Sequence, residues 1–175
     1  MSVADPALSR RRLLQLGAGA TVVLAAAGGA AWLWRPGVRD GALTRSGRAV
    51  FRAIARVVLE GSLPTEAAAL EAALDRHLLR LDETIAGLPA ATQGEIAQLL
   101  GLLSVAVTRR WLTGLRSDWP EARIDELEAA LRRMRTTDHE LRQQAYHALR
   151  DLTNAAFYAQ PEHWPLMGYP GPSPV

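Results

Sequence analysis

Hydrophobic residues recur every three to four positions along most of the chain, which is the period of an amphipathic α-helix. Beyond residue 43 this pattern predicts five helices with short connections, and no stretch shows the alternation of a strand. Short connections favour antiparallel neighbours. We therefore expect an all-α fold, an antiparallel bundle of about five helices. The helices should begin near Thr44, Glu66, Thr92, Trp119 and Thr137, and the last should end near Phe157 and Tyr158.

Turn and capping residues mark the expected helix ends. Gly61 and Pro64 should stop the first helix, near Leu59, and Gly87-Leu88-Pro89 the second, near Ala86. The run Ile96–Val107 is apolar on nearly all faces, so we expect the third helix at the centre of the domain. Two sequences predict capping boxes, in which each side chain satisfies a backbone N–H at the other residue: Thr92-x-x-Glu95 and Thr137-x-x-Glu140.

The first 35 residues follow a different pattern. Three arginines, Arg10 to Arg12, precede a run from Leu13 to Trp34 that carries no charge. The sequence resembles the twin-arginine export signal, in which Ser or Thr precedes two Arg, any residue and two hydrophobic residues. Gln15 stands where such signals usually have Lys. The expected translocation signal consists of Ser9, Arg10, Arg11, Leu13 and Leu14.

The sequence leaves the fate of this leader open. Small residues between Ala25 and Ala31 offer cleavage sites for a signal peptidase. The 22 uncharged residues from Leu13 to Trp34 also suffice to span a hydrocarbon core of ~30 Å. Trp32, Trp34 and Arg35 would then suit the far interface. An ordinary membrane anchor or secretory signal is the alternative to the twin-arginine reading.

Charge is divided unevenly between the leader and the rest of the chain. All 20 basic residues are Arg, four of them within the first 35 positions, where Asp5 is the one acidic residue among 18. Residues 36–175 therefore carry sixteen basic and seventeen acidic residues, a net charge of about −1. The sequence pI of about 9.6 belongs to the leader, so nucleic-acid binding loses its main support. The absence of Cys excludes disulfides, thiol chemistry and Fe–S clusters.

The chain is expected to have four parts. Residues 1–35 are the twin-arginine signal or membrane anchor, 36–43 a polar linker and 44–160 the helical domain. Residues 161–175 hold five of the ten prolines and two large aromatic residues. We expect this tail to be extended rather than helical, and to lie against its own domain or a partner.

No pattern indicates a catalytic, cofactor-binding or metal site. The four histidines lack the four-residue spacing of a helical metal site, and His77 is expected at the boundary of its helix's apolar stripe. The carboxylates should lie on solvated helix faces among arginines, and no Ser or Gly-rich loop has a catalytic context. We therefore expect no enzyme. The remaining histidines are His139, His147 and His163.

Two further features have a structural and a functional interpretation. The first helix carries an arginine stripe, which could be a plain solvent face or could contact lipid headgroups or an acidic partner. Trp111, near the end of the third helix, is expected in the core. The stripe consists of Arg45, Arg48, Arg52 and Arg56.

The C-terminal sequence resembles the signature of the gluconate 2-dehydrogenase subunit 3 family. In that family an aromatic pair ends a helix, a Pro and a Trp follow, and the chain closes on Gly-Tyr-Pro-Gly-Pro. The leader, the size of the helical body and the absence of Cys agree with the family, but between the leader and residue 157 the likeness is one of pattern only. The matching positions, expected to bind a partner or fix the tail, are Phe157, Tyr158, Pro161, Trp164, Gly168, Tyr169, Pro170, Gly171 and Pro172.

The resemblance implies a small non-catalytic subunit of a FAD-dependent dehydrogenase of the glucose-methanol-choline type. In such systems the large subunit folds around FAD in the cytoplasm and leaves through the twin-arginine translocon with the small subunit, and a c-type cytochrome subunit often accepts the electrons. The small subunit itself would hold no cofactor. It would lie in the periplasm, or on the cytoplasmic membrane facing the periplasm. The alternative is a stand-alone, membrane-anchored helical protein of the envelope, and a binding module or enzyme with an unrecognised site is a third.

Overall fold

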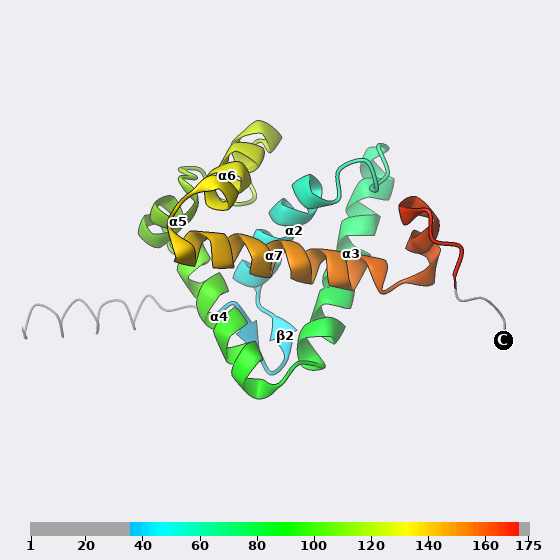
Figure 1. Ribbon diagram of the computed structural model, residues 1–175, viewed down its shortest axis with the longest axis horizontal. Coiled ribbons are helices and arrows are strands. Elements are labelled where there is room, and N and C mark those ends of the chain that lie inside the picture. The colour runs from blue at the N-terminus through cyan, green and yellow to red at the C-terminus, as the bar shows by residue number, and fades with distance from the viewer. Residues whose placement is uncertain (1–35, 172–175) are drawn as a thin grey trace, which may run out of the picture. The chain divides into compact units, whose positions relative to one another are not determined.

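The computed structural model describes residues 36–171 (Figure 1). Within this range the chain is mostly helical, which confirms the predicted fold class. A two-stranded hairpin precedes the helices, and a 3₁₀ helix follows them. The elements are β1 (Val38–Arg39), β2 (Ala42–Leu43), α2 (Arg45–Val58), α3 (Ala67–Ala86), α4 (Ala90–Ser104), α5 (Ala106–Thr113), α6 (Ile124–Thr136), α7 (Glu140–Tyr158) and η1 (Pro161–Met167).

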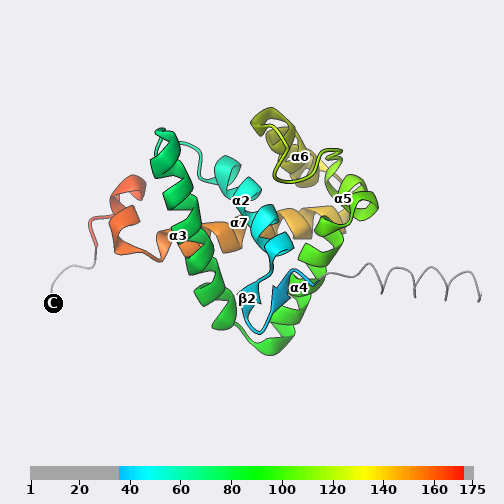
Figure 2. The same ribbon diagram turned by 180° about the vertical axis from the view of Figure 1, so that it is seen from behind.

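Helix α2 lies at the centre of this domain. Val50, Phe51 and Ile54 are 0% exposed, and the helix packs against α3, α4, α6 and α7. The prediction of a central third helix is wrong, because α4 buries mainly one side, with Leu100 and Leu103, while residues such as Gln98 remain exposed. Figure 2 shows α3 and α4 as two arms that meet at one end, with the hairpin between them.

Residues 36–43, which we expected to be a linker, form an antiparallel hairpin. Val38 pairs with Leu43, and both side chains are buried. Asp40 and Gly41 make the turn with φ of 52° and 77°, as the two-residue turns between antiparallel strands require. The Asp-Gly pair is a hairpin signal, but two-residue strands are too short to show an alternating pattern.

Two glycines allow the hairpin to lie directly on the helices. A Cβ at Gly47 in α2 would come within 2.2 Å of the Gly37 carbonyl oxygen, and a Cβ at Gly37 would lie 2.0 Å from that of Leu100. Gly37 also donates a hydrogen bond to Ala97 in α4, and its carbonyl accepts one from Thr44. The hairpin, α2 and α4 are therefore in backbone contact.

The arginine stripe of α2 turns out to face α3 in part. Arg48 pairs with Asp82, and Arg52 pairs with Glu71, at 2.6 Å, and with Asp75. Asp82 also accepts a hydrogen bond of 2.7 Å from the backbone N–H of Leu43. One carboxylate thus joins the hairpin, α2 and α3, and these two arginines stabilise the fold instead of forming a plain solvent face.

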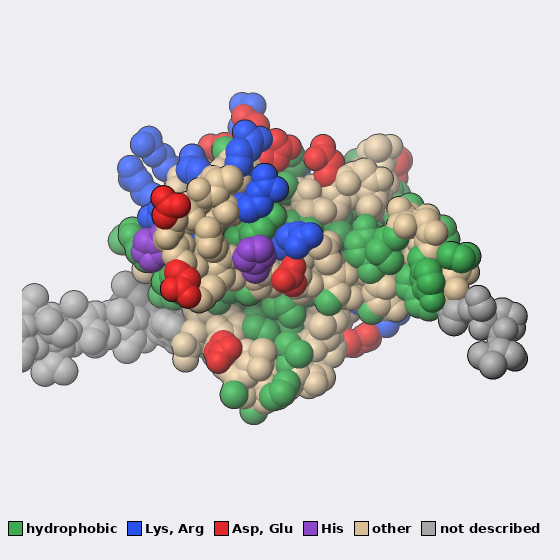
Figure 3. All heavy atoms as spheres, in the orientation of Figure 1, with side chains coloured by type: hydrophobic (Ala, Val, Ile, Leu, Met, Phe, Trp, Pro, Cys, Tyr) green, Lys and Arg blue, Asp and Glu red, His purple; other side chains and the backbone are tan. Residues whose placement is uncertain are grey.

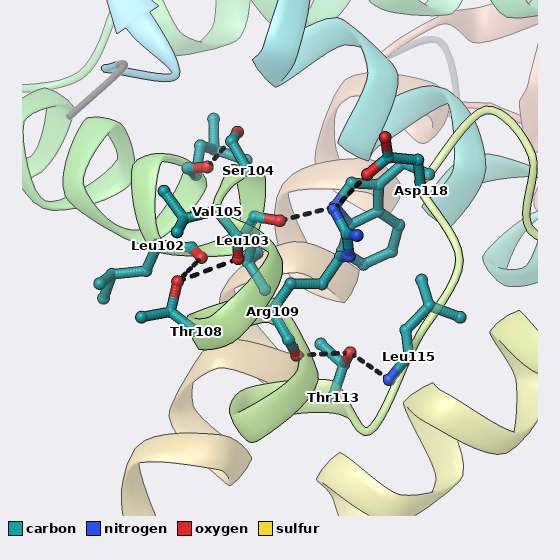
Figure 4. Close-up of polar contacts among 11 residues, drawn as sticks. Leu102, Leu103, Ser104, Val105, Thr108, Arg109, Thr113, Leu115 and Asp118 are labelled. Atoms are coloured by element: carbon teal, nitrogen blue, oxygen red, sulfur yellow. Dashed lines mark hydrogen bonds and ion pairs between the residues drawn. The ribbon is translucent and has the colours of Figure 1, made fainter. Parts of the chain in front are cut away.

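The third predicted helix is broken at Val105 into α4 and α5, which are bent by 99°. Side chains supply hydrogen bonds to the carbonyls at the end of α4 (Figure 4). Trp119 Nε1 donates to Leu103 at 2.8 Å, and Thr108 donates to Leu102. Because these donors replace the missing helical N–H groups, the break leaves no unpaired carbonyl at these two residues. No single helix within residues 36–171 is long and apolar enough to cross a membrane, although the bent pair meets both criteria together.

The loop between α5 and α6 is held by buried side chains. Arg109 of α5 is almost fully buried and lies 2.5 Å from a carboxylate oxygen of Asp118 (Figure 4), and the next residue, Trp119, is also buried. The fourth helix was expected to start at Trp119-Pro120, but these residues form a turn and α6 begins at Ile124. Burial of the indole explains the difference.

Both predicted capping boxes are wrong. Helix α4 already begins at Ala90, after Pro89, so Thr92 and Glu95 lie inside it. Helix α7 begins at Glu140 with His139 at its N-cap. There the Thr137 hydroxyl accepts a hydrogen bond from the backbone N–H of His139 at 3.2 Å and makes a local turn.

We predict that Gly47→Ala destabilises the domain by about 1–3 kcal/mol, because the new methyl group would force the hairpin away from α2. Gly94 in α4 is the matched control, since a Cβ there would meet nothing within 4 Å. Gly94→Ala should stabilise the helix by about 0.5–1 kcal/mol. Urea unfolding followed by far-UV circular dichroism measures both changes. Equal unfolding midpoints for the two variants would contradict the proposed contact.

Candidate partner-binding site

The tail is not extended, as the sequence had suggested, but begins with the 3₁₀ helix η1. Pro161 is its first residue, where no N–H donor is needed. The backbone N–H of Gly168 donates to Pro165, and that of Tyr169 donates to Trp164. The prediction that a Pro-rich segment excludes a helix is wrong here, because Pro161 occupies the first position of a short 3₁₀ segment, which also contains Pro165.

His163 fixes η1 to the end of α7. Its Nδ1 lies 2.7 Å from the carbonyl oxygen of Phe157, which can only accept, so Nδ1 carries the hydrogen. The imidazole also stacks on the Phe157 ring, with centroids 3.7 Å apart and planes 3° apart. Phe157 is buried beside Leu59 and Leu74. His163 therefore attaches the tail to a buried residue of the core.

Trp164 makes a second attachment. Its Nε1 donates a hydrogen bond of 3.0 Å to the Tyr158 carbonyl, and its ring lies 5.4 Å from that of Tyr169. Gly168 and Gly171 have φ of 72° and 98°, which lets the chain turn back over Trp164. A carbon at the Cβ position of Gly171 would lie 3.7 Å from this indole.

The structure thus brings together most of the residues singled out from the C-terminal sequence. Phe157 is buried, Tyr158 and Trp164 are partly buried, and Pro161, Tyr169 and Pro170 are exposed. The Tyr158 hydroxyl lies 3.5 Å from that of Ser62. Pro172 lies outside the described residues, as do the translocation-signal residues Ser9, Arg10, Arg11, Leu13 and Leu14.

Three large hydrophobic side chains of the tail remain about half exposed: Leu166, Met167 and Tyr169. Sequence analysis had singled out Tyr169 but neither Leu166 nor Met167, because neither residue belongs to the family signature. Figure 3 shows hydrophobic side chains gathered at the end of the molecule that carries the tail. Attachment through His163 and Trp164 therefore holds an exposed apolar surface in a fixed position.

Behind the tail lies a cavity of about 260 Å³, lined by residues of α3, the end of α7 and η1. Its lining includes His77, which was expected at a helix boundary but is only 4% exposed. Phe157 covers His77, with ring centroids 6.1 Å apart. Neither ring nitrogen of His77 has a hydrogen-bond partner. Burial, aided by repulsion from His163, lowers the pKa of His77 from 6.5 to about 4, so this imidazole is neutral at pH 7.

The two other histidines and Trp111 do not line this cavity. His139 contacts Trp111 edge-on, and His147 contacts Tyr146. Trp111, expected in the core, is 48% exposed. Within residues 36–171, no three His, Asp or Glu side chains lie close enough together to hold a metal ion.

Comparison of the chain with protein-family models, with curated proteins and with solved structures finds no match.

We predict that the buried neutral His77 makes stability depend on pH. The unfolded chain takes up a proton near pH 6.5, whereas the folded chain does so near pH 4. The stability that depends on a neutral His77 is therefore fully present above pH 6.5 and is lost as the pH falls towards 4. The free energy of unfolding should fall by about 2 kcal/mol between pH 7 and pH 5. Urea unfolding at the two pH values measures the loss.

His77→Leu is the control for this effect. Leucine fills a similar volume, and no hydrogen bond is lost because the imidazole makes none. The variant should be at least as stable as the parent at pH 5. Its free energy of unfolding should no longer show the part of the decrease between pH 7 and pH 5 that is due to His77. An unchanged slope in His77→Leu would contradict the assignment.

Proposed function

We propose that this chain is a non-catalytic accessory subunit of a FAD-dependent dehydrogenase of the glucose-methanol-choline type. In this proposal it escorts the folded flavoprotein through the twin-arginine translocon and then stabilises it or tethers it to the membrane. Residues 1–35 act as the signal or anchor ahead of the helical bundle. FAD belongs to the partner, and a c-type cytochrome subunit is a further expected member of the complex.

The observation that carries the proposal is the fixed apolar surface of the tail. Exposed large hydrophobic residues that lie next to one another are a common mark of a protein interface. Because His163 and Trp164 already hold η1 on α7, docking would cost little conformational entropy. The same segment carries the signature that resembles the dehydrogenase subunit, so two independent features support one surface.

The expected export signal in the leader explains how a small subunit could export a larger partner. Twin-arginine export accepts folded cargo, and a flavoprotein needs its FAD before it leaves the cytoplasm. A small subunit with the signal can therefore carry a large subunit that has none. This division of roles accounts for a chain that combines an export signal, a small helical domain and an apolar tail surface.

The alternative is a stand-alone, membrane-anchored envelope protein. It is favoured by the hydrogen bonds of His163 and Trp164 to the carbonyls of α7, which fix the tail without any partner. The two functions differ in whether the exposed side chains of the tail contact another protein.

We predict that replacing both Arg10 and Arg11 by Lys keeps the chain in the cytoplasm, because the translocon recognises the arginine pair rather than charge alone. Fractionation of the native host measures the distribution. Arg12→Lys is the matched control, since it leaves the pair intact and should be exported. Normal export of the double variant would contradict the twin-arginine assignment.

We predict that replacing Leu166 and Met167 by Ser strongly reduces the flavoprotein that copurifies with the chain, while the fold is retained because both side chains are exposed. The ratio of flavin absorbance to total protein measures the complex. Val107→Ser is the control, since Val107 is exposed on α5, away from the tail. Undiminished flavin in the Leu166 and Met167 variant would contradict a docking role for the tail.

A further inference from the structure

Helix α5 presents an unusual exposed surface. Val107 is 79% exposed and Trp111 is 48% exposed, the first being the most exposed of the large hydrophobic residues described. The two residues are four positions apart, so they lie on the same side of the helix. Both side chains therefore lie outside the buried core, just after the bend at Val105. We call it the α5 face, consisting of Val107, Arg110 and Trp111.

Basic side chains surround Trp111. Arg110, Arg133 and Arg142 line a shallow depression beside the indole. The Arg142 guanidinium lies 5.2 Å from the centre of the ring. None of the ion pairs among the described residues involves these three arginines. In Figure 3, hydrophobic and basic side chains lie near one another, with acidic side chains among them, at the end of the molecule formed by α5 and α6.

Among the described residues, the acidic side chains nearest to Arg142 in the sequence form no ion pair with it. Asp138 and Glu140 flank the N-terminus of α7, where the helix dipole favours negative charge. Glu140 accepts a hydrogen bond of 3.1 Å from Gln144, one turn along the helix. Arg110 and Arg142 therefore remain available to an anionic group from outside, whereas Arg133 donates a hydrogen bond of 3.3 Å to the Thr113 carbonyl and shares a second depression with Asp125 and Glu126.

We propose that the α5 face lies on the surface of an anionic lipid bilayer. Tryptophan prefers the headgroup region, an exposed valine gains by entering the acyl boundary, and arginines are attracted to anionic headgroups. A surface that combines apolar and basic groups is better suited to the interface of an anionic bilayer than to bulk water. This contact is separate from the tail, which lies at the other end of α7.

The position of Pro36, where the described chain begins, supports a lipid occupant over a protein one. Thirty-five residues precede it, including the uncharged run from Leu13 to Trp34. Next to it, Gly37 is hydrogen-bonded to Ala97 in α4, about 10 Å along the helix from the end of α4 at Ser104. A retained anchor, which is part of the proposed function, would therefore bring α5 close to the membrane.

The absence of Cys from the sequence permits a direct test with the full chain. Val107→Cys and, in a second variant, Leu79→Cys each provide one thiol for an environment-sensitive fluorophore. Both side chains are exposed, and Leu79 lies on α3 as the matched control. The labelled chains are reconstituted into vesicles of phosphatidylcholine alone or mixed with phosphatidylglycerol, and brominated lipids serve as quenchers.

In vesicles with phosphatidylglycerol, the probe at position 107 should shift to the blue and be quenched by brominated lipid, while the probe at position 79 should not. Adding Arg110→Gln and Arg142→Gln to the variant labelled at position 107 should lower the equilibrium constant for contact of the α5 face with the bilayer about fivefold per arginine. If the chain binds the vesicles but the two probes show the same emission and the same quenching, the proposed lipid contact is overturned. The interpretation of residues 1–35 as an anchor would not be affected by that result.

Two other results would also overturn it. If the chain does not float with the vesicles, the anchor itself fails, and the proposed tethering fails with it. If the copurified flavoprotein shields the probe at position 107 in the absence of lipid, the α5 face is a protein interface. In that case the escort function would stand and the lipid contact would not.

Discussion

The Cα of Gly47 in α2 lies so close to the carbonyl oxygen of Gly37 that any side chain would separate the two segments. This contact places the hairpin against the central helix, and the rest of the domain is arranged around that helix. Asp82 joins α3 to the hairpin and α2 through the Leu43 N–H and Arg48. A small domain with no disulfide depends on such close backbone packing, because its apolar core is modest.

The two ends of α7 carry different surfaces because η1 packs against its C-terminal end and α5 against its N-terminal end. At its C-terminus, Phe157 is buried in the core, so the imidazole of His163 can stack on it and hold the tail. At its N-terminus, Arg142 and His139 contact Trp111 of α5. One helix thus connects an apolar surface suited to a protein partner with an aromatic and basic surface suited to a membrane. The proposed accessory role would use the first surface for the partner and the second beside the anchor.

The helical class and most of the long helices could be predicted from the sequence, because apolar residues repeat with the helical period over many turns. Thr44 and Gly87 also mark helix ends in the structure, as N-cap and C-cap. The break at Val105 could not be predicted, since it depends on Trp119, a residue distant in sequence whose indole reaches the Leu103 carbonyl. His77 and Trp111 were misjudged for a related reason: burial depends on whether another segment covers a helix face.

For the candidate site, the sequence indicated the aromatic and glycine positions of the tail but not their attachment. Trp164 and Gly171 meet only because η1 turns the chain back, which proline content alone does not predict. The central claim is that this chain carries a flavoprotein out of the cytoplasm. Gentle purification of the unaltered chain from the periplasm and membrane of its native host tests it most directly. The account predicts a yellow complex with a much larger protein, and a colourless monomer that also fails to cross-link to a flavoprotein would contradict it.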